Sequence, residues 1–214
     1  MSGASLVCVI DDEPLVRQVT CRILSEGGFQ AVEYGSADEF LAAFDELACG
    51  CVVTDLRMPD IDGAELLARL RKSGSIVAVV VLTGHADVRT AVKLMEDGAL
   101  TLLEKPYEPE SLLATVERAT SQTAARQAAR QRVVMVERRL AQLTDDERQI
   151  MECMIAELPT KAIAAKLILS TRTVERRMFS VLQKMQVSGV AELATLMASL
   201  QPPPFPSFAP EAHD

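Results

Sequence analysis

The sequence predicts a doubly wound α/β unit with a parallel sheet, followed by a small all-α unit. Three observations support this fold class. Four short apolar runs, each followed by a helical pattern, lie in the first half, as parallel sheets require. Short amphipathic segments separated by proline and turn residues fill the second half. Charge divides at the same place, because residues 1–120 hold 10 Lys and Arg against 20 Asp and Glu, and residues 121–214 hold 12 against 10.

The four apolar runs are predicted to be buried strands at residues 6–10, 51–54, 76–82 and 99–103. Each run ends at polar residues that carry chemistry. The first is followed by Asp11 and Asp12, and the others by Asp55, Thr83 and Lys105. Since ligands of open parallel sheets sit beyond the carboxyl ends of the strands, these side chains are predicted to face one crevice.

The acids in this set indicate a divalent cation. Carboxylates that gather at close range stay ionised together only with a counter-ion such as Mg²⁺. An isolated acid, a hydroxyl and an ammonium complete the equipment for phosphoryl transfer. The acid accepts the phosphoryl group, and the ammonium and the hydroxyl stabilise its oxygens. Each residue alone is more often a cap or a solvated charge, so the prediction depends on the complete set.

Residues 4–120 resemble the receiver domain of two-component response regulators, and residues 54–63, TDLRMPDIDG, resemble the FixJ type. The resemblance implies a flavodoxin-like, five-stranded doubly wound sheet. It also implies that a histidine kinase phosphorylates Asp55, that Thr83 and Lys105 respond to the phosphoryl group, and that the Lys105-Pro106 bond can be cis. The Mg²⁺ ligands would be Asp11, Asp12, Asp55 and the backbone carbonyl of Arg57.

One switch position departs from the receiver pattern. Receivers commonly carry an aromatic side chain three residues before the lysine, and this chain has Leu102 there. Leucine has no ring to exchange between exposed and buried rotamers. A movement of the Thr83 hydroxyl is therefore expected to change the receiver surface less. Tyr107 is a second candidate for surface recognition, although it also suits an ordinary half-buried aromatic position.

Residues 108–140 are predicted to form one long helix, because they contain no glycine and no proline after Pro109. Leu112 and Val116 have the spacing of a helix that packs on the sheet. The segment 120–132 has few large apolar groups and is predicted to be an exposed helical linker. A coiled-coil dimer seam is an alternative for its later part, although the heptads are few.

A second unit is predicted to start at Thr144, where Thr144 and Glu147 have the spacing of a capping box. Pro159 ends the first helix, and further helices are expected at 161–167, 172–185 and 191–200. The second and third are short and joined by a tight turn, and residues 160–185 hold six basic residues against Glu175 alone. Two short helices joined by a tight turn and rich in basic residues indicate a helix-turn-helix.

Residues 143–196 resemble the DNA-binding domain of the LuxR/FixJ (NarL-like) class, on the stretches LPTKAIA at 158–164 and STRTVE at 170–175. The resemblance implies that residues 172–185 are a recognition helix and that the last helix dimerises. Contacts to bases would come from Glu175, Arg176 and Phe179, and contacts to phosphates from Lys161, Arg172, Thr173 and Lys184. Glu157 departs from the pattern, because a glycine is frequent there.

The five cysteines are expected to be buried and reduced, since only His85 and His213 are available to complete a zinc site and neither has ligand spacing. This placement argues against a zinc or disulfide redox sensor. No run is long enough to cross a membrane, so the cytoplasm is expected. The proline-rich segment 201–214 is predicted to be disordered.

These features together predict a non-enzymatic, phosphorylation-controlled transcription factor with Mg²⁺ as cofactor. Its predicted divisions are a receiver at 1–120, a helical linker at 121–142, a DNA-binding domain at 143–200 and a tail at 201–214. The expected partners are a histidine kinase, promoter DNA and a second copy of the chain, with RNA polymerase as a further candidate. The alternative is a signalling or phosphorelay adaptor that acts through protein partners instead of DNA.

Overall fold

The computed structural model describes residues 5–84, 87–198 and 200. The chain forms two compact units, Met1–Ala128 and Ala129–Asp214. The predicted disorder of residues 201–214 and the two histidines lie outside the described residues.

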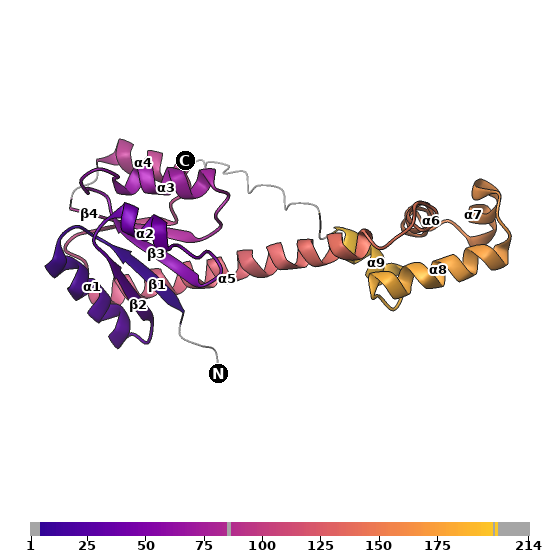
Figure 1. Ribbon diagram of the computed structural model, residues 1–214, viewed down its shortest axis with the longest axis horizontal. Coiled ribbons are helices and arrows are strands. Elements are labelled where there is room, and N and C mark those ends of the chain that lie inside the picture. Colours follow the sequence, from indigo (N-terminus) through magenta and orange to yellow (C-terminus); the bar gives the residue numbers. More distant parts are fainter. Residues whose placement is uncertain (1–4, 85–86, 199, 201–214) are drawn as a thin grey trace, which may run out of the picture. The chain divides into compact units, whose positions relative to one another are not determined.

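The first unit contains a parallel sheet in the order β2-β1-β3-β4-β5 (Figure 1). Its strands are β1 (Leu6–Ile10), β2 (Gln30–Tyr34), β3 (Cys49–Asp55), β4 (Ala78–Thr83) and β5 (Thr101–Glu104). β4 is buried along its whole length, as expected of a central strand covered on both faces. The four apolar runs therefore predicted four strands correctly. They did not indicate β2, which alternates polar and apolar residues at the edge of the sheet.

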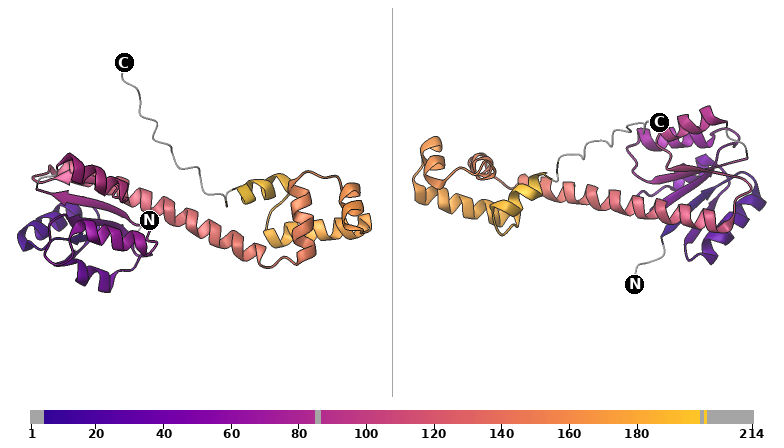
Figure 2. Two further views of the ribbon diagram at one scale, coloured as in Figure 1. Left: turned by 90° about the horizontal axis from the view of Figure 1, so that it is seen from above. Right: turned by 180° about the vertical axis from the view of Figure 1, so that it is seen from behind.

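Helices cover both faces of this sheet. They are α1 (Pro14–Glu26), α2 (Ala37–Ala43), α3 (Gly63–Lys72), α4 (Val88–Glu96) and α5 (Pro109–Leu140). One core layer holds Phe40 of α2, Leu66 of α3 and Leu94 of α4 against the sheet. The other holds Leu24 of α1 and Leu112 of α5. Figure 2 shows these helices from two further directions. The doubly wound α/β prediction is confirmed.

The long helix α5 is confirmed, but the prediction of an exposed linker from residue 120 is wrong for its first part. Thr123 is 1% exposed, and its hydroxyl accepts a 2.9 Å hydrogen bond from the backbone N–H of Ala78 at the start of β4. Gln127 donates to the carbonyl of Glu46 at 2.9 Å. Polar side chains pack here because they satisfy backbone groups at the amino edge of the sheet, where apolar groups could not.

The second unit is all α. Its helices after α5 are α6 (Asp145–Ile155), α7 (Thr160–Leu167), α8 (Thr171–Met185) and α9 (Val190–Ala198). The predicted capping box is present, because the Thr144 side chain accepts from the Glu147 N–H and the Glu147 carboxylate accepts from the Thr144 N–H. Ile150, Ile163 and Val181 lie in one shared core, each 0% exposed. α7 and α8 therefore form the predicted helix-turn-helix.

All five cysteines are buried free thiols, as predicted. Among the described residues, no group of three or more His, Cys, Asp or Glu side chains is placed to hold a metal ion. No helix in the described part of the chain is long and apolar enough to span a bilayer.

Candidate phosphoacceptor site and nucleic-acid interface

The carboxyl edge of the sheet brings an aspartate pair together around one lysine. The Lys105 ammonium donates to Asp11 Oδ2 at 2.8 Å and to Asp55 Oδ1 at 2.5 Å. Asp11 is 1% exposed and Asp55 is 8% exposed. Burial is the largest single influence on the Lys105 pKa and lowers it, but the hydrogen bonds to Asp11 and Asp55 and the charges of these two carboxylates together raise the pKa above its usual value.

The backbone fixes the other oxygen of each aspartate. Asp11 Oδ1 accepts from the N–H of Glu13 at 2.9 Å, and Asp55 Oδ2 accepts from the N–H of Arg57 at 2.7 Å. Gly63 allows the start of α3 to lie against the backbone of Asp55, because a Cβ at this position would collide with the Asp55 carbonyl oxygen. Both carboxylates are therefore held in defined orientations.

A small surface pocket of about 320 Å³ opens over Asp55. Its lining includes Thr83 at the end of β4 and Lys105 after β5, as predicted, together with Arg57. Glu13 and Gly84 also line it, and the strand-end pattern did not select them. Glu13 belongs to the acidic run that opens at Asp11, which was the only signal for it. Asp12 is exposed and is not among the lining residues.

Two further switch candidates lie near this edge. Leu102 is partly buried and packs against the core layer of α2, α3 and α4. Tyr107 packs on the opposite layer, and its hydroxyl lies 2.6 Å from the hydroxyl of Thr20 on α1. The Lys105-Pro106 peptide bond between them is cis, as the resemblance implied. Tyr107 therefore ties the segment after β5 to α1.

The donor set at this edge fits Mg²⁺. This cation keeps several waters and uses one or two carboxylates, so it does not need three clustered acids. Among the ion pairs of the described residues, the two buried carboxylates of Asp11 and Asp55 share the one ammonium of Lys105, so these pairs carry a net negative charge. A hard cation beside them would balance that charge.

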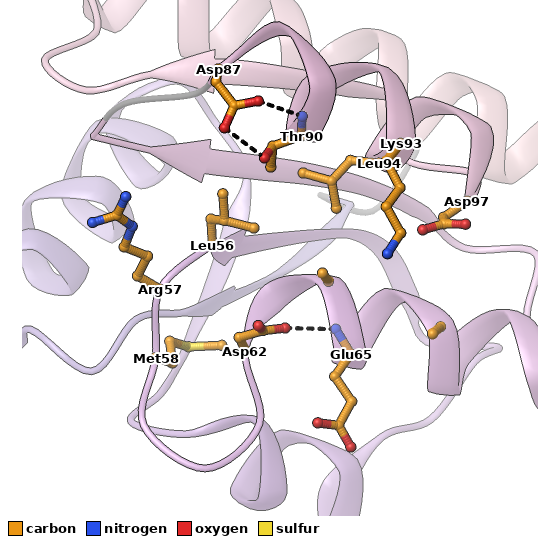
Figure 3. Close-up of a pocket in the computed structure, with 12 residues that line it drawn as sticks. Leu56, Arg57, Met58, Asp62, Glu65, Asp87, Thr90, Lys93, Leu94 and Asp97 are labelled. Carbon is orange, nitrogen blue, oxygen red and sulfur yellow. Dashed lines mark hydrogen bonds between the residues drawn. The ribbon is translucent and has the colours of Figure 1, made fainter.

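A larger surface pocket of about 780 Å³ lies between the loop after β3, α3 and α4 (Figure 3). Two of its acids are occupied as helix caps. Asp62 accepts from the N–H of Glu65, and Asp87 accepts from both the N–H and the hydroxyl of Thr90. Arg57 lines both pockets, but Asp55 lines only the smaller one. The larger pocket is therefore a neighbour of the aspartate site and not the site itself.

The outward face of α8 matches the predicted DNA-reading set in exposure. Arg172, Glu175 and Arg176 are exposed, and Phe179 is 65% exposed although it is aromatic. Lys161 on α7 is exposed as well. The inward side of α8 is buried in the core, with Val174, Val181 and Met185 all 0% exposed. The helix thus presents cations and one ring on a rigid support.

Two residues predicted to contact phosphates have partners within the domain. The hydroxyls of Thr173 and Ser170 lie 2.8 Å apart, and Ser170 caps α8 by accepting from the Thr173 N–H. The Lys184 ammonium donates to Glu147 Oε2 at 2.6 Å, and its side chain is 33% exposed. An ammonium has three donors, so this bond leaves Lys184 able to make others.

Family models match both units. Residues 7–117 match the response regulator receiver domain, and residues 141–197 match the luxR family of bacterial regulatory proteins. A receiver joined to a helix-turn-helix domain defines a two-component response regulator that binds DNA. The chain belongs to this family.

The relatives cover nearly the whole chain. It is 40% identical to the transcriptional regulatory protein FixJ of Bradyrhizobium diazoefficiens over 198 residues, 92% of this chain and 96% of that protein. It is 37% identical to FixJ of Rhizobium meliloti, over 89% of this chain and 93% of that protein. Its fold resembles the response regulator StyR with a TM-score of 0.83, at 32% identity over 90% and 98% of the two chains. Full-length FixJ from B. japonicum gives a TM-score of 0.57, at 37% identity over 92% and 97%.

Proposed function

We propose that this response regulator is phosphorylated on Asp55 by a histidine kinase and that the phosphoryl group controls DNA binding through α8. The observation that carries the proposal is the Lys105 ammonium that donates to both Asp11 and Asp55 at the carboxyl edge of the sheet. The receiver domain implies a kinase as phosphodonor, and the luxR-type domain implies DNA as target.

The transfer step uses residues already in place. An oxygen of Asp55 attacks the phosphorus of the phosphohistidine, the P–O bond forms as the P–N bond breaks, and the imidazole of the donor leaves. Lys105 then shares its charge with a phosphoryl oxygen, and the Thr83 hydroxyl donates to another. Asp11, Asp12, Asp55 and the Arg57 carbonyl would hold Mg²⁺, which neutralises phosphoryl oxygens when bound.

A groove beside the site suits the kinase. It measures about 540 Å³ and is lined by Leu15, Val19, Lys105 and Tyr107 among others. Leu15 is 77% exposed and Val19 is 56% exposed, so this part of α1 presents apolar side chains to solvent. Because Lys105 lines both the groove and the pocket over Asp55, a helix of the kinase docked here would bring its histidine close to Asp55.

On the output side, α8 enters the major groove. Glu175, Arg176 and Phe179 contact base edges, and Lys161 and Arg172 contact phosphates together with Thr173 and Lys184.

The apolar row Val88, Val92 and Met95 on α4 is 47–79% exposed and supports a homodimer of phosphorylated receivers. α9 is a second dimer element, on DNA. RNA polymerase is a further partner, and the cytoplasm is the compartment where these partners meet.

Phosphorylation is tested with the full chain, acetyl phosphate and Mg²⁺. Asp55→Asn is expected to abolish incorporation of hydroxylamine-labile phosphate, measured by intact mass. Asp38→Asn, an exposed acid on α2, is the matched control and should incorporate phosphate normally. Unchanged labelling of Asp55→Asn would place the acceptor at another residue.

DNA binding is tested by gel shift on promoter fragments, with and without phosphodonor. Phosphorylation should tighten binding, and raising the salt concentration should weaken it, because cationic side chains release counter-ions from the phosphates. Salt-insensitive binding, or none in either state, would contradict the DNA output and favour an adaptor that acts on proteins.

A further inference from the structure

Two thiols far apart in the sequence meet at the amino half of the receiver sheet. Cys8 lies in β1 and Cys49 opens β3, and their sulfur atoms are 3.5 Å apart. Cys8 is 3% exposed and Cys49 is 1% exposed. Both belong to the core layer that faces α2, α3 and α4. A disulfide needs about 2.05 Å between sulfurs, so a local shift of about 1.5 Å would join them.

The backbone around Cys49 is suited to such a shift. Leu6 of β1 pairs with Cys49, but the next residue, Val7, pairs with Cys51, so Gly50 is an extra residue in β3. A bulge of this kind interrupts the regular ladder of hydrogen bonds on one strand. Cys49 therefore sits on the irregular end of β3, beyond the continuous pairing that runs on to Asp55.

Within the pair, Cys8 differs chemically from the other cysteines of the receiver, whereas the hydrogen bond with Cys8 and burial raise the pKa of Cys49. The hydrogen bond with Cys49 lowers the pKa of Cys8, although burial opposes this effect. Burial raises the pKa of Cys51 and raises that of Cys21 to about 12. Because the thiolate is the nucleophile, Cys8 is the thiol of this group best prepared to react.

A surface pocket gives a small oxidant a way as far as Cys49, whose sulfur lies 3.5 Å from that of Cys8. The pocket, of about 430 Å³ at the amino edge of the sheet, is lined by Leu6, Cys49, Gly50 and Thr120 among others. This pocket is distinct from the pocket over Asp55, which shares none of its lining residues. Hydrogen peroxide is small enough to use it, whereas a protein disulfide exchanger is not.

The placement of the cysteines in the sequence argued against a disulfide sensor, but the fold brings these two sulfurs together. We propose that Cys8 and Cys49 form a reversible disulfide when the receiver meets hydrogen peroxide. The Cys8 thiolate attacks one peroxide oxygen, the O–O bond breaks, and the departing hydroxide becomes water, which leaves Cys8 as a sulfenic acid. The Cys49 sulfur then attacks the Cys8 sulfur, the S–O bond breaks, and a second water leaves. In total, two thiols and one peroxide give one disulfide and two waters, and a dithiol reductant reverses the change.

The bond would link β1 and β3 without touching the phosphoacceptor. Cys8 precedes Asp11 by three residues and Cys49 precedes Asp55 by six, which along a strand is roughly 10 Å and 20 Å. A cross-link between residues 41 apart restricts the unfolded receiver, so the melting temperature of the receiver should rise by about 5 °C or more on oxidation.

The test uses the full chain, reduced first and then treated with hydrogen peroxide. Free thiols are blocked by alkylation in acid and denaturant, and the peptides are identified by mass spectrometry. The expected result is a peptide pair joined through Cys8 and Cys49, with Cys21, Cys51 and Cys153 alkylated, and complete reversal by dithiothreitol. The melting temperature of the receiver is measured on the same samples.

Variants give the matched comparison. Cys49→Ser should abolish the linked peptide and the rise in melting temperature, whereas Cys153→Ser, which removes a buried thiol of the second unit, should keep both. If Cys49→Ser fails to fold, the wild-type peptide map still decides. Free Cys8 and Cys49 after oxidation, over-oxidation of Cys8 without a link, or a link through another cysteine would each overturn the proposal.

Discussion

Each unit of this response regulator holds a lysine paired with a buried carboxylate, and the two pairs differ in charge balance. In the receiver, one ammonium at Lys105 serves two aspartates, Asp11 and Asp55. In the DNA-binding unit, one ammonium at Lys184 serves one glutamate, Glu147. The receiver cluster therefore keeps a surplus negative charge, and the second cluster is neutral.

The difference separates a reactive site from a structural one. Glu147 has both oxygens occupied, since Oε1 accepts from Ser180, and Oε2 accepts from Lys184 and from the backbone of Thr144. Nothing is left for a ligand to neutralise. Asp11 and Asp55 are equally well oriented, but their surplus charge can attract a cation and then a phosphoryl group. The same side-chain types thus stabilise a fold in one unit and provide chemistry in the other.

The largest expected effect comes from removing the ammonium of the charged cluster. Lys105→Ala leaves two buried carboxylates without a cation, so the free energy of unfolding of the receiver should fall by about 3 kcal/mol without Mg²⁺. Adding Mg²⁺ should restore part of this loss, because a ligand that binds only the folded state stabilises it. Urea unfolding with and without Mg²⁺ measures both effects, and the exposed Lys72→Ala serves as control. No loss, or no response to Mg²⁺, would mean that Asp11 and Asp55 carry no surplus charge.

The stability that the neutral cluster of Glu147 and Lys184 provides should instead depend on pH. The hydrogen bond from Lys184, together with those from the Thr144 backbone and Ser180, lowers the pKa of Glu147 to about 2, below the usual 4.5. A lowered carboxyl pKa means that the stabilisation is complete above about pH 4.5 and is lost as the pH falls through 2. Glu147→Gln should therefore cost about 2 kcal/mol at pH 7 and almost nothing near pH 2.

Hydrogen exchange of the α6 and α8 amides reports this difference locally. The control is Glu152→Gln, an exposed acid on the same helix, which should match the wild type at every pH. An equal loss for Glu147→Gln at pH 7 and pH 2 would show that packing, and not charge, accounts for its contribution.

Substitutions on the exposed face of α8 should change the affinity for DNA and not the stability of the domain. Arg176→Ala removes an exposed cation from α8, so DNA binding is expected to weaken about tenfold, or about 1.4 kcal/mol. Its melting temperature should stay unchanged, in contrast to both buried clusters. Fluorescence anisotropy with a promoter duplex measures the affinity, and Arg138→Ala on the exposed side of α5 is the control. Equal weakening by both variants would indicate a diffuse charge effect.

The smallest expected effect is a gain in stability. Glu157 adopts φ +53° just after α6, where Glu157 and Leu158 donate to the carbonyls of Met154 and Cys153. This left-handed turn favours glycine, so Glu157→Gly should stabilise the second unit by about 0.5 kcal/mol. Gly74→Ala is the converse test, because Gly74 has φ +78° and space around it, so only backbone strain should destabilise that variant. A loss of stability in Glu157→Gly, seen in thermal melts, would contradict this account.

The sequence predicted the strand ends well because period and polarity are local signals. Asp55, Thr83 and Lys105 each follow an apolar run, and all three line one pocket. The edge strand β2 gave no such run, since one side of it lacks a neighbouring strand. Thr123 was misjudged for a related reason, because its burial depends on a backbone N–H of β4 that lies 45 residues away.

What the sequence by itself determined is the identity of each local part: four strands, the capping box at Thr144, the cationic outward face of α8 and the acids at the strand ends. What only the tertiary structure decided is which parts meet. Lys105 reaches Asp11 across 94 residues, Lys184 reaches Glu147 across 37, and Cys8 reaches Cys49 across 41. Helix and strand periodicities act over a few residues, whereas these pairings follow from strand order and helix packing.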